Sequence, residues 1–233
     1  MRLDKFISQN SRFSRKEIKK AIRDSAVTIA GKVCTDAGYH LQTGAEVHLD
    51  GERIDWPTSL YFMLNKPAGY CCSHIDDGYP SLFRLLDTDR EKLHIAGRLD
   101  ADTTGLVLLS SDGQWSHRVT SPKQKAGKCS DKIYHVVLAK PLTEDAITQL
   151  EQGILLRSET KPTRPARLKR LSDTVCELAI QEGKYHQVKR MFAAVGNQVT
   201  ALHRLQIAGI RLDPTLKEGE YRPLTQPEID QFC

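Results

Sequence analysis

The clearest periodic pattern in the chain lies between residues 11 and 23. At about 100° per residue, Ile18 and Ile22 fall on one side of a helix, and basic residues fall on the other. Ser14 followed by Glu17 is the pattern of a capping box, which marks where such a helix begins. The pattern predicts an amphipathic helix with one strongly basic face.

Short alternating segments after this helix are typical of strands. The first two are residues 26–29 and 46–49, and turn residues follow both. Beyond residue 60, three further segments predict strands, namely 61–64, 105–109 and 132–138. These local patterns predict an α+β protein, but they do not determine how the strands pair.

One more helix is predicted near the C-terminal end of the chain. Its apolar residues are Val188, Met191, Phe192 and Val195. This spacing of i, i+3, i+4 and i+7 places all four on one side of a helix, where they would pack in the core. The helix should end at Gly196-Asn197, because glycine and asparagine favour the backbone conformation that terminates helices.

The length and composition limit the classes of protein to consider. A chain of 233 residues can form one domain of ordinary size, or a small domain and a larger one. Apolar residues make up 39% of it, and no apolar run approaches the roughly 18 to 20 residues that span a bilayer. Residues 1–5 include an early acid and lead into no secretory signal core. We therefore expect a cytoplasmic protein without a membrane partner.

The six cysteines are scattered and contain no C-x-x-C pair. They are Cys34, Cys71, Cys72, Cys129, Cys176 and Cys233. We expect ordinary reduced thiols rather than a zinc site or a redox pair. No other cluster of metal-ligating residues stands out in the sequence, so we expect no bound metal.

The net charge of +5 is concentrated in one segment. Residues 11–23 hold six basic residues and one acid, so this segment has the same net charge as the whole chain. The six are Arg12, Arg15, Lys16, Lys19, Lys20 and Arg23. Charges of one sign on one helix face favour contact with nucleic-acid phosphates; a solvated surface is the alternative.

The order of motifs in the first 58 residues resembles the S4 RNA-binding domain, a small α/β module. The motifs are Arg2 to Ile7, Ser14-Arg15, Val27 to Val33 and Thr43 to Val47. The unit should close near Trp56-Pro57-Thr58-Ser59. The resemblance implies that residues 1–58 form this domain and that the bound polyanion is RNA.

Asp100 and Asp102 lie two positions apart in a polar segment before a predicted strand. As the acid and base of glycoside hydrolysis, they would need a separation of roughly 5 to 9.5 Å across a sugar. They could instead hold a divalent metal together with ligands from elsewhere. A polar loop with a salt bridge to Arg98 is the third interpretation, and the residues themselves do not decide between them.

A family resemblance bears on this choice. The segment Gly97-Arg98-Leu99-Asp100-x-x-Thr103-Thr104-Gly105-Leu106 resembles the signature that carries the catalytic aspartate of pseudouridine synthases. Three more segments match motifs of that family in the expected order: Asn65 to Gly69, Lys132-x-Tyr134 and Glu182 to Met191. Together with the S4-like segment, the resemblance covers nearly the whole chain.

The resemblance also implies roles for individual residues. Asp100 would be catalytic, Tyr134 would contact the target base, and Lys189 would pair with Asp100. Much of the family has arginine at the position of Lys189, and lysine offers a point charge rather than a bidentate fork. RNA contacts are also expected at Lys66, Arg98, Lys132 and Arg190. His186 and His203 receive no catalytic role, and we expect them to serve structure or RNA contact.

For fold and function, the resemblance implies a catalytic domain over residues 59–233, with a mixed, mainly antiparallel sheet flanked by helices. It implies conversion of a single uridine in 16S ribosomal RNA to pseudouridine, without a cofactor. A monomer would act on that RNA either free or within a partly assembled small ribosomal subunit. The alternative is a non-catalytic S4-type RNA-binding or ribosome-assembly factor, which would explain residues 1–58 but not the four later motifs.

Overall fold

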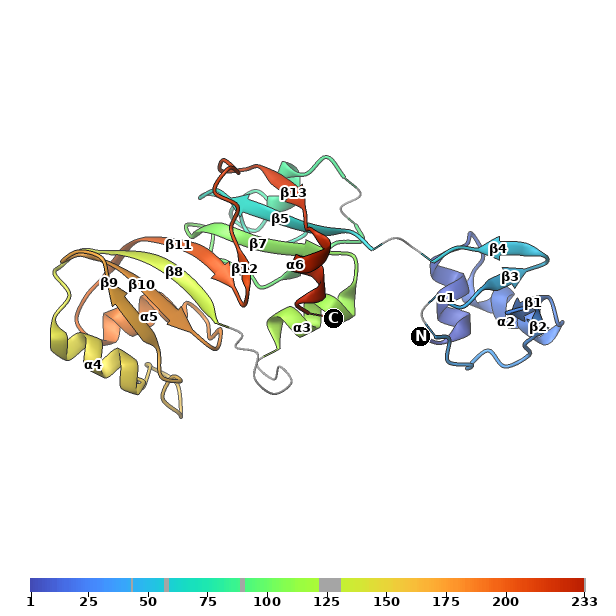
Figure 1. Ribbon diagram of the computed structural model, residues 1–233, viewed down its shortest axis with the longest axis horizontal. Coiled ribbons are helices and arrows are strands. Elements are labelled where there is room, and N and C mark those ends of the chain that lie inside the picture. The colour runs from blue at the N-terminus through green and yellow to red at the C-terminus, as the bar shows by residue number, and fades with distance from the viewer. Residues whose placement is uncertain (43, 57–58, 89–90, 122–130, 233) are drawn as a thin grey trace. The chain divides into compact units, whose positions relative to one another are not determined.

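The computed structural model describes residues 1–42, 44–56, 59–88, 91–121 and 131–232. Several positions considered above lie outside the described residues: Thr43, Pro57, Thr58, Cys129 and Cys233. The chain forms two compact units, Met1–Thr58 and Ser59–Cys233 (Figure 1).

In the first unit, two helices share a core with a four-stranded antiparallel sheet of order β2-β1-β3-β4. Its elements are α1 (Leu3–Gln9), α2 (Arg15–Arg23), β1 (Val27–Ile29), β2 (Lys32–Val33), β3 (Val47–Leu49) and β4 (Glu52–Ile54). The strands predicted over 26–29 and 46–49 are confirmed as β1 and β3. Phe6, Ile18 and Val47 are fully buried in the shared core.

Helix α2 is the predicted amphipathic helix. The Ser14 hydroxyl accepts a hydrogen bond from the Glu17 amide at 3.4 Å, and the Glu17 carboxylate accepts one from the Ser14 amide at 2.7 Å. This capping box satisfies amides that the first helical turn leaves unpaired. Ile18 and Ile22 are fully buried, and all five basic residues of the helix are exposed. The predicted division into an apolar and a basic face is confirmed.

The second unit is built on a mixed sheet of order β13-β5-β7-β11-β8-β10-β9, with β12 paired to β11 and β6 to β7. Its strands are β5 (Tyr61–Lys66), β6 (His94–Ala96), β7 (Thr104–Ser110), β8 (Lys132–Leu138), β9 (Arg167–Arg170), β10 (Val175–Ile180), β11 (Val199–Ile207), β12 (Ile210–Arg211) and β13 (Tyr221–Pro223). Its helices are the 3-10 helix η1 (Leu82–Leu85), α3 (Gly113–Thr120), α4 (Glu144–Gln152), α5 (Gln187–Ala194) and α6 (Gln226–Asp230). Strands β7 and β11 are parallel, whereas the other described pairs are antiparallel. The expected mixed, mainly antiparallel sheet is confirmed.

Helices cover both faces of this sheet (Figure 1). Successive residues of a strand point to opposite faces, so neighbours such as Met63 and Leu64 enter different cores. Leu64 and Val107 pack in a core with residues of α4 and α5, and Met63 and Leu108 pack with residues of α3. Burial on both faces explains why β5 and β7 are continuous apolar runs rather than alternating ones.

The helix predicted near the C-terminus is confirmed as α5. Val188, Met191 and Phe192 are buried at its contact with the sheet, and Gly196 follows with a φ of +76°. In the described part of the chain, no helix is long and apolar enough to cross a membrane. The cysteines within that part, Cys34, Cys71, Cys72 and Cys176, are free thiols.

Candidate active site

Asp100 lies in the loop that connects β6 to β7, and β7 begins beside the central parallel strand β11. Gly105 pairs with Arg204 at that point, and a Cβ at Gly105 would lie 2.4 Å from the Arg204 carbonyl oxygen. Gly105 also has a φ of +99°, a conformation that residues with a Cβ rarely adopt. Glycine is therefore required where the loop enters the sheet.

A buried arginine of β11 holds the first part of this loop. Arg204 is 1% exposed, and its Nε donates to the carbonyl of Leu106 at 2.8 Å. One Nη donates to the carbonyl of Gly97 at 2.8 Å, and the other to that of Arg98 at 3.3 Å. Because Gly97 and Arg98 lie just before Asp100 and Leu106 lies in β7, the guanidinium ties the N-terminal side of the loop to the sheet.

A buried lysine of β5 holds the second part. Lys66 is completely buried, and its Nζ donates to the carbonyls of Pro67, Ala101 and Thr103 at 2.9, 3.1 and 2.8 Å. Burial lowers the pKa of Lys66. The expected RNA contact of Lys66 is wrong, because its donors are directed at carbonyls inside the protein and none of the side chain reaches the surface.

The Asp100 carboxylate is 27% exposed and faces two basic side chains from the start of α5. Its Oδ2 lies 3.1 Å from Nζ of Lys189, and its Oδ1 lies 3.3 Å from Nε2 of His186. The same Lys189 Nζ lies 2.6 Å from Oδ1 of Asp102. Lys189 therefore bridges both carboxylates, and its shorter contact is to Asp102. These ion pairs replace the salt bridge to Arg98 considered above.

The bridging lysine is held in its charged form. Partial burial lowers the pKa of Lys189, but its hydrogen bonds to Asp102 and Asp100 outweigh burial and leave that pKa raised. Partial burial likewise raises the pKa of Asp102, and the hydrogen bond from Lys189 outweighs it and leaves that pKa lowered. A persistent positive charge thus lies beside Asp100.

His186 reaches Asp100 through an unusual backbone conformation. It lies directly before α5 and has φ 45° and ψ 37°, in the left-handed region. Such a conformation is strained for a residue other than glycine, and strain of this kind concentrates at functional sites. The backbone of His186 thus brings the imidazole to Asp100.

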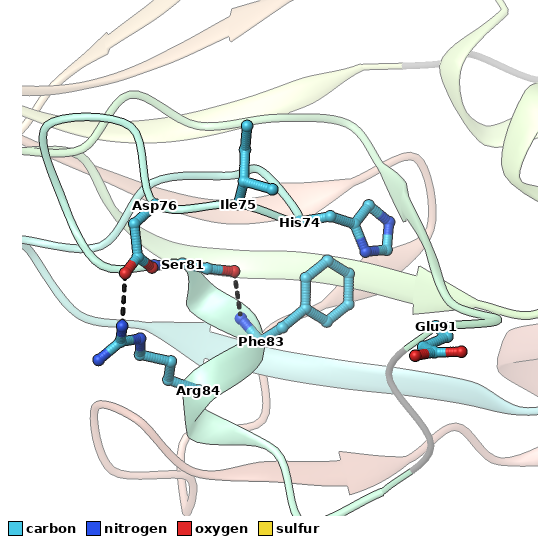
Figure 2. A pocket seen from close by; sticks show the side chains of 7 residues that line it. All are labelled: His74, Ile75, Asp76, Ser81, Phe83, Arg84 and Glu91. Atoms are coloured by element: carbon cyan, nitrogen blue, oxygen red, sulfur yellow. Dashed lines mark hydrogen bonds and ion pairs between the residues drawn. The ribbon is translucent and has the colours of Figure 1, made fainter.

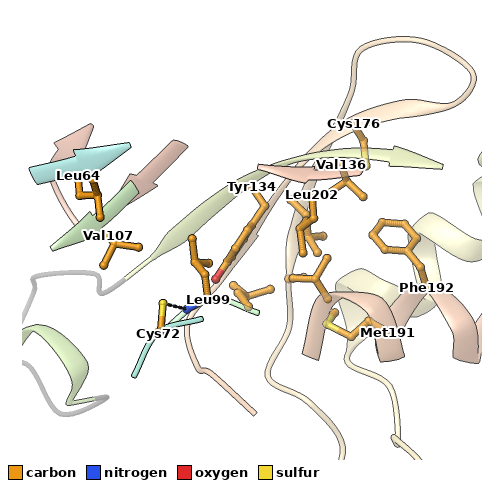
Figure 3. Packing of buried hydrophobic residues seen from close by; sticks show 14 of the residues in the cluster. Leu64, Cys72, Leu99, Val107, Tyr134, Val136, Cys176, Met191, Phe192 and Leu202 are labelled. Atoms are coloured by element: carbon orange, nitrogen blue, oxygen red, sulfur yellow. Dashed lines mark hydrogen bonds between the residues drawn. The ribbon is translucent and has the colours of Figure 1, made fainter. Parts of the chain in front are cut away.

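Tyr134 belongs to the core beneath the loop. It is 7% exposed, and Figure 3 shows its ring extending from β8 toward Leu99, the residue before Asp100. The Leu99 amide donates to Sγ of Cys72 at 3.3 Å, so this side of the loop also rests on the core. Tyr134 thus packs under the Asp100 segment, and its contact with a target base stays a prediction.

Three further residues with expected RNA contacts lie at different depths. Arg98 is exposed. Lys132 is half-buried, its Nζ donates to the carbonyl of Glu182 at 3.3 Å, and burial lowers its pKa to about 8. Arg190 donates to Glu159 and to the carbonyls of Tyr185 and Arg157. RNA contact stays a prediction for all three, and for the basic residues of α2.

A separate hollow of about 500 Å³ lies over η1 (Figure 2). His74 stacks on Phe83 in its wall, and Asp76 accepts hydrogen bonds from Arg84 and from the amide of Ser81. The charges of Asp76 and Arg84 therefore offset each other. Across the described ranges, no group of three or more His, Cys, Asp or Glu side chains is arranged to hold a metal ion.

The sequence pattern did not identify His186, Arg204 or the shared contact of Asp102 as parts of this site. A signal for Arg204 existed, because it alternates with the buried Leu202 along a strand and so takes an inward position. His186 carried no comparable signal. Its approach to Asp100 depends on one backbone conformation and on the packing of α5.

The site can perform chemistry that needs one reachable carboxylate. Asp100 is fixed through the backbone on both sides, lies next to a permanent positive charge and remains partly exposed. Such a group can attack an electrophilic carbon or remove a proton from a bound substrate.

Comparison with known proteins identifies the family. Residues 60–194 match the RNA pseudouridylate synthase family, and residues 1–55 match the S4 domain. A relative from Haemophilus influenzae, named ribosomal small subunit pseudouridine synthase A, is 50% identical over 234 residues, covering 100% of this chain and 99% of that protein. The protein of the same name from Escherichia coli strain K12 is 48% identical over 231 residues, covering 98% of each. A crystal structure of a pseudouridylate synthase, 50% identical and covering 100% of both chains, superposes with a TM-score of 0.71. The chain belongs to the RNA pseudouridylate synthase family, with an S4 domain preceding the synthase domain.

Proposed function

We propose that this protein converts a single uridine of 16S ribosomal RNA to pseudouridine. The substrate is inferred from the names of its relatives, which it matches over nearly the full length of both chains. In this isomerisation the bond between N1 of uracil and C1′ of ribose breaks. The base then turns, C5 bonds to C1′, and the proton of C5 is removed while N1 gains one, so no redox cofactor is needed.

The observation that carries the proposal is the setting of Asp100. Its carboxylate is reachable, is fixed through the carbonyls on both sides and has Lys189 at 3.1 Å. Asp100 acts on the ribose, either as nucleophile at C1′ or as base at C2′. Lys189 and His186 orient the carboxylate, and Lys189 offsets its charge.

Binding and chemistry are divided between the two units. The exposed basic residues of α2, together with Arg12, contact phosphates and supply affinity without reading sequence. The target base leaves its stack to reach Asp100, where Tyr134 contacts it. The protein acts in the cytoplasm as a monomer, on 16S ribosomal RNA that is free or within a partly assembled small subunit.

Pseudouridine mapping tests this function. Purified protein is incubated with 16S and 23S ribosomal RNA made by transcription, which contain no pseudouridine at the start. We expect one new site, in 16S RNA, after incubation with the wild-type protein. New sites in 23S RNA only would refute the proposed substrate, and no new site in either RNA would refute the proposed activity.

A further inference from the structure

An exposed tyrosine lies next to the site and has no place in the mechanism above. Tyr185 is 75% exposed, the largest value among the large hydrophobic residues that the structure describes as exposed. Its ring stacks on the imidazole of His186, with centroids 3.8 Å apart and an interplanar angle of 21°. His186 in turn lies 3.3 Å from Asp100. The tyrosine ring therefore stacks directly on the imidazole that contacts the candidate catalytic carboxylate.

Contacts on the neighbouring backbone hold this ring pair in place. Arg190 of α5 donates to the carbonyl of Tyr185 at 3.0 Å and to Glu159 at 3.1 Å. Lys184 donates to the other carboxylate oxygen of Glu159 at 2.8 Å. Lys184 and Arg190, which flank the ring pair in the sequence, therefore bind the same carboxylate, that of Glu159. The backbone around the ring is therefore fixed, and the ring face that does not stack on His186 is open to a ligand, because the residue is 75% exposed.

The ring also forms one wall of a hollow of about 660 Å³. Arg157 and Arg190 line the same hollow, as do Ala193 and Ala194 of α5 and Glu159, whose carboxylate is paired with Lys184 and Arg190. The side chain of Arg157 is exposed. An aromatic wall, small apolar residues and a nearby guanidinium match the parts of a nucleotide, which offers a flat base and a phosphate.

We infer that the Tyr185–His186 ring pair is a stacking platform for the nucleotide next to the target uridine in the RNA strand. This inference rests on the proposed function. The neighbouring base stacks on the free face of Tyr185, and its phosphate faces Arg157. Stacking on an aromatic face tolerates any base, so the platform contributes affinity and placement rather than base identity. It holds the strand beside Asp100 while the target base is out of its stack.

The test is a double-mutant cycle between protein and RNA. The protein variants are Tyr185→Leu, which removes the ring, and Tyr185→Phe, which keeps it. Tyr79→Leu is the matched control, because Tyr79 is another exposed tyrosine of the same unit. The RNA substrates are a 16S fragment with the target uridine, and the same fragment with an abasic nucleotide on its 5′ or its 3′ side. KM and kcat for pseudouridine formation are measured for each combination.

We expect Tyr185→Leu to raise KM about tenfold or more on intact RNA and to change kcat less, as loss of one stacked base would do. Tyr185→Phe should remain near the wild type. The abasic nucleotide on one side should impair the wild-type enzyme by a similar factor but should not impair Tyr185→Leu further. The inference is overturned if the loss caused by Tyr185→Leu and the loss caused by the abasic nucleotide multiply at both the 5′ and the 3′ position. It is also overturned if Tyr79→Leu raises KM as much as Tyr185→Leu does.

A fluorescence measurement keeps this test independent of turnover. The nucleotide next to the target uridine is replaced by 2-aminopurine, whose fluorescence falls when it stacks. Binding to the wild-type protein should quench the signal, and binding to Tyr185→Leu at saturation should quench it much less. Equal quenching by both proteins would overturn the inference. Failure of the wild type to form pseudouridine would instead overturn the proposed function, and the quenching would still report on the platform.

Discussion

The basic face of α2 and the loop around Asp100 both depend on positive side chains, but those side chains donate to different groups. On α2, Arg15, Lys19 and Arg23 are exposed to solvent. Around the loop, Lys66 and Arg204 are buried and donate to backbone carbonyls. The sequence shows that the side chains are basic in both cases, but only the structure shows which groups they contact.

This difference predicts what each kind of residue contributes. Removing a buried cation leaves several carbonyls without donors, so stability and the shape of the loop should suffer. Removing an exposed cation changes the electric field around the unit and leaves the fold intact. Lys189 and Lys132 lie between these extremes, since both are half-buried and both have partners inside the protein.

The largest effect on stability is expected from Arg204→Met. The change leaves the carbonyls of Gly97, Arg98 and Leu106 without their buried donor. It should lower the free energy of unfolding by about 3 kcal/mol or more. In thermal melts, Arg211→Met on the exposed edge of β12 is the matched control and should change the melting temperature little. Equal melting temperatures for the two variants would contradict the structural role of Arg204.

The next effect concerns the bridging cation. Lys189→Met removes the charge at 3.1 Å from Asp100 and should lower kcat roughly a hundredfold, which corresponds to about 2.7 kcal/mol. Lys189→Arg keeps a charge at this position and should retain a substantial part of the activity. Arg190→Met changes the adjacent cation, which contacts Glu159 and the carbonyls of Tyr185 and Arg157 but not Asp100, and should act mainly on KM. Similar, mild changes of kcat at both positions would show that Lys189 is the wrong cation.

The basic face of α2 should affect binding more than turnover. Reversing the charge of Arg15, Lys19 and Arg23 to glutamate should weaken RNA binding and flatten its dependence on salt. Charge-preserving exchange between lysine and arginine at the same positions is the control and should keep both properties. Binding isotherms at several salt concentrations measure the effect. An unchanged affinity and salt slope in the reversed variant would mean that this face is only solvated surface.

The smallest expected effect is a pH dependence at Lys132. Its pKa of about 8 in the folded protein lies below the ordinary value of 10.5, chiefly because of burial. Between these two pH values the unfolded chain binds a proton that the folded protein has released, so the cost of burying this amine falls and the free energy of unfolding increases as pH rises. Denaturant unfolding from pH 8 to 10.5 should show wild-type stability rising relative to that of Lys132→Met. Parallel curves would contradict this burial of the ammonium.

Much of the fold could be predicted from local patterns. The alternation of residues gave β1, β3 and β8, and the capping box located the start of α2, because these signals arise from residues close together in the sequence. The pairing of β7 with β11 has no such signal. It joins residues about a hundred positions apart, and the family resemblance implied only a mixed, mainly antiparallel sheet without naming this pair.

The candidate site likewise has features that the sequence predicts and features that depend on the tertiary structure. Asp100 and Lys189 were proposed because they stand in family motifs. The RNA contact expected at Lys66 was wrong, because a motif does not reveal whether a side chain faces outward or into the protein. His186 was expected to serve structure or RNA contact, and its contact with Asp100 was not predicted. That contact depends on a left-handed backbone and on the packing of α5, and neither feature produces a periodic pattern in the sequence.

The most direct test of the account compares the two carboxylates that share Lys189. Asp100→Asn keeps the size of the side chain but removes both nucleophile and base. Pseudouridine formation should become undetectable, while RNA binding stays within roughly tenfold, or about 1.4 kcal/mol. Asp102→Asn should leave measurable activity, and thermal melts should show both variants folded. A folded Asp100→Asn protein that still forms pseudouridine, beside an inactive Asp102→Asn protein, would contradict the account and assign the catalytic role to Asp102.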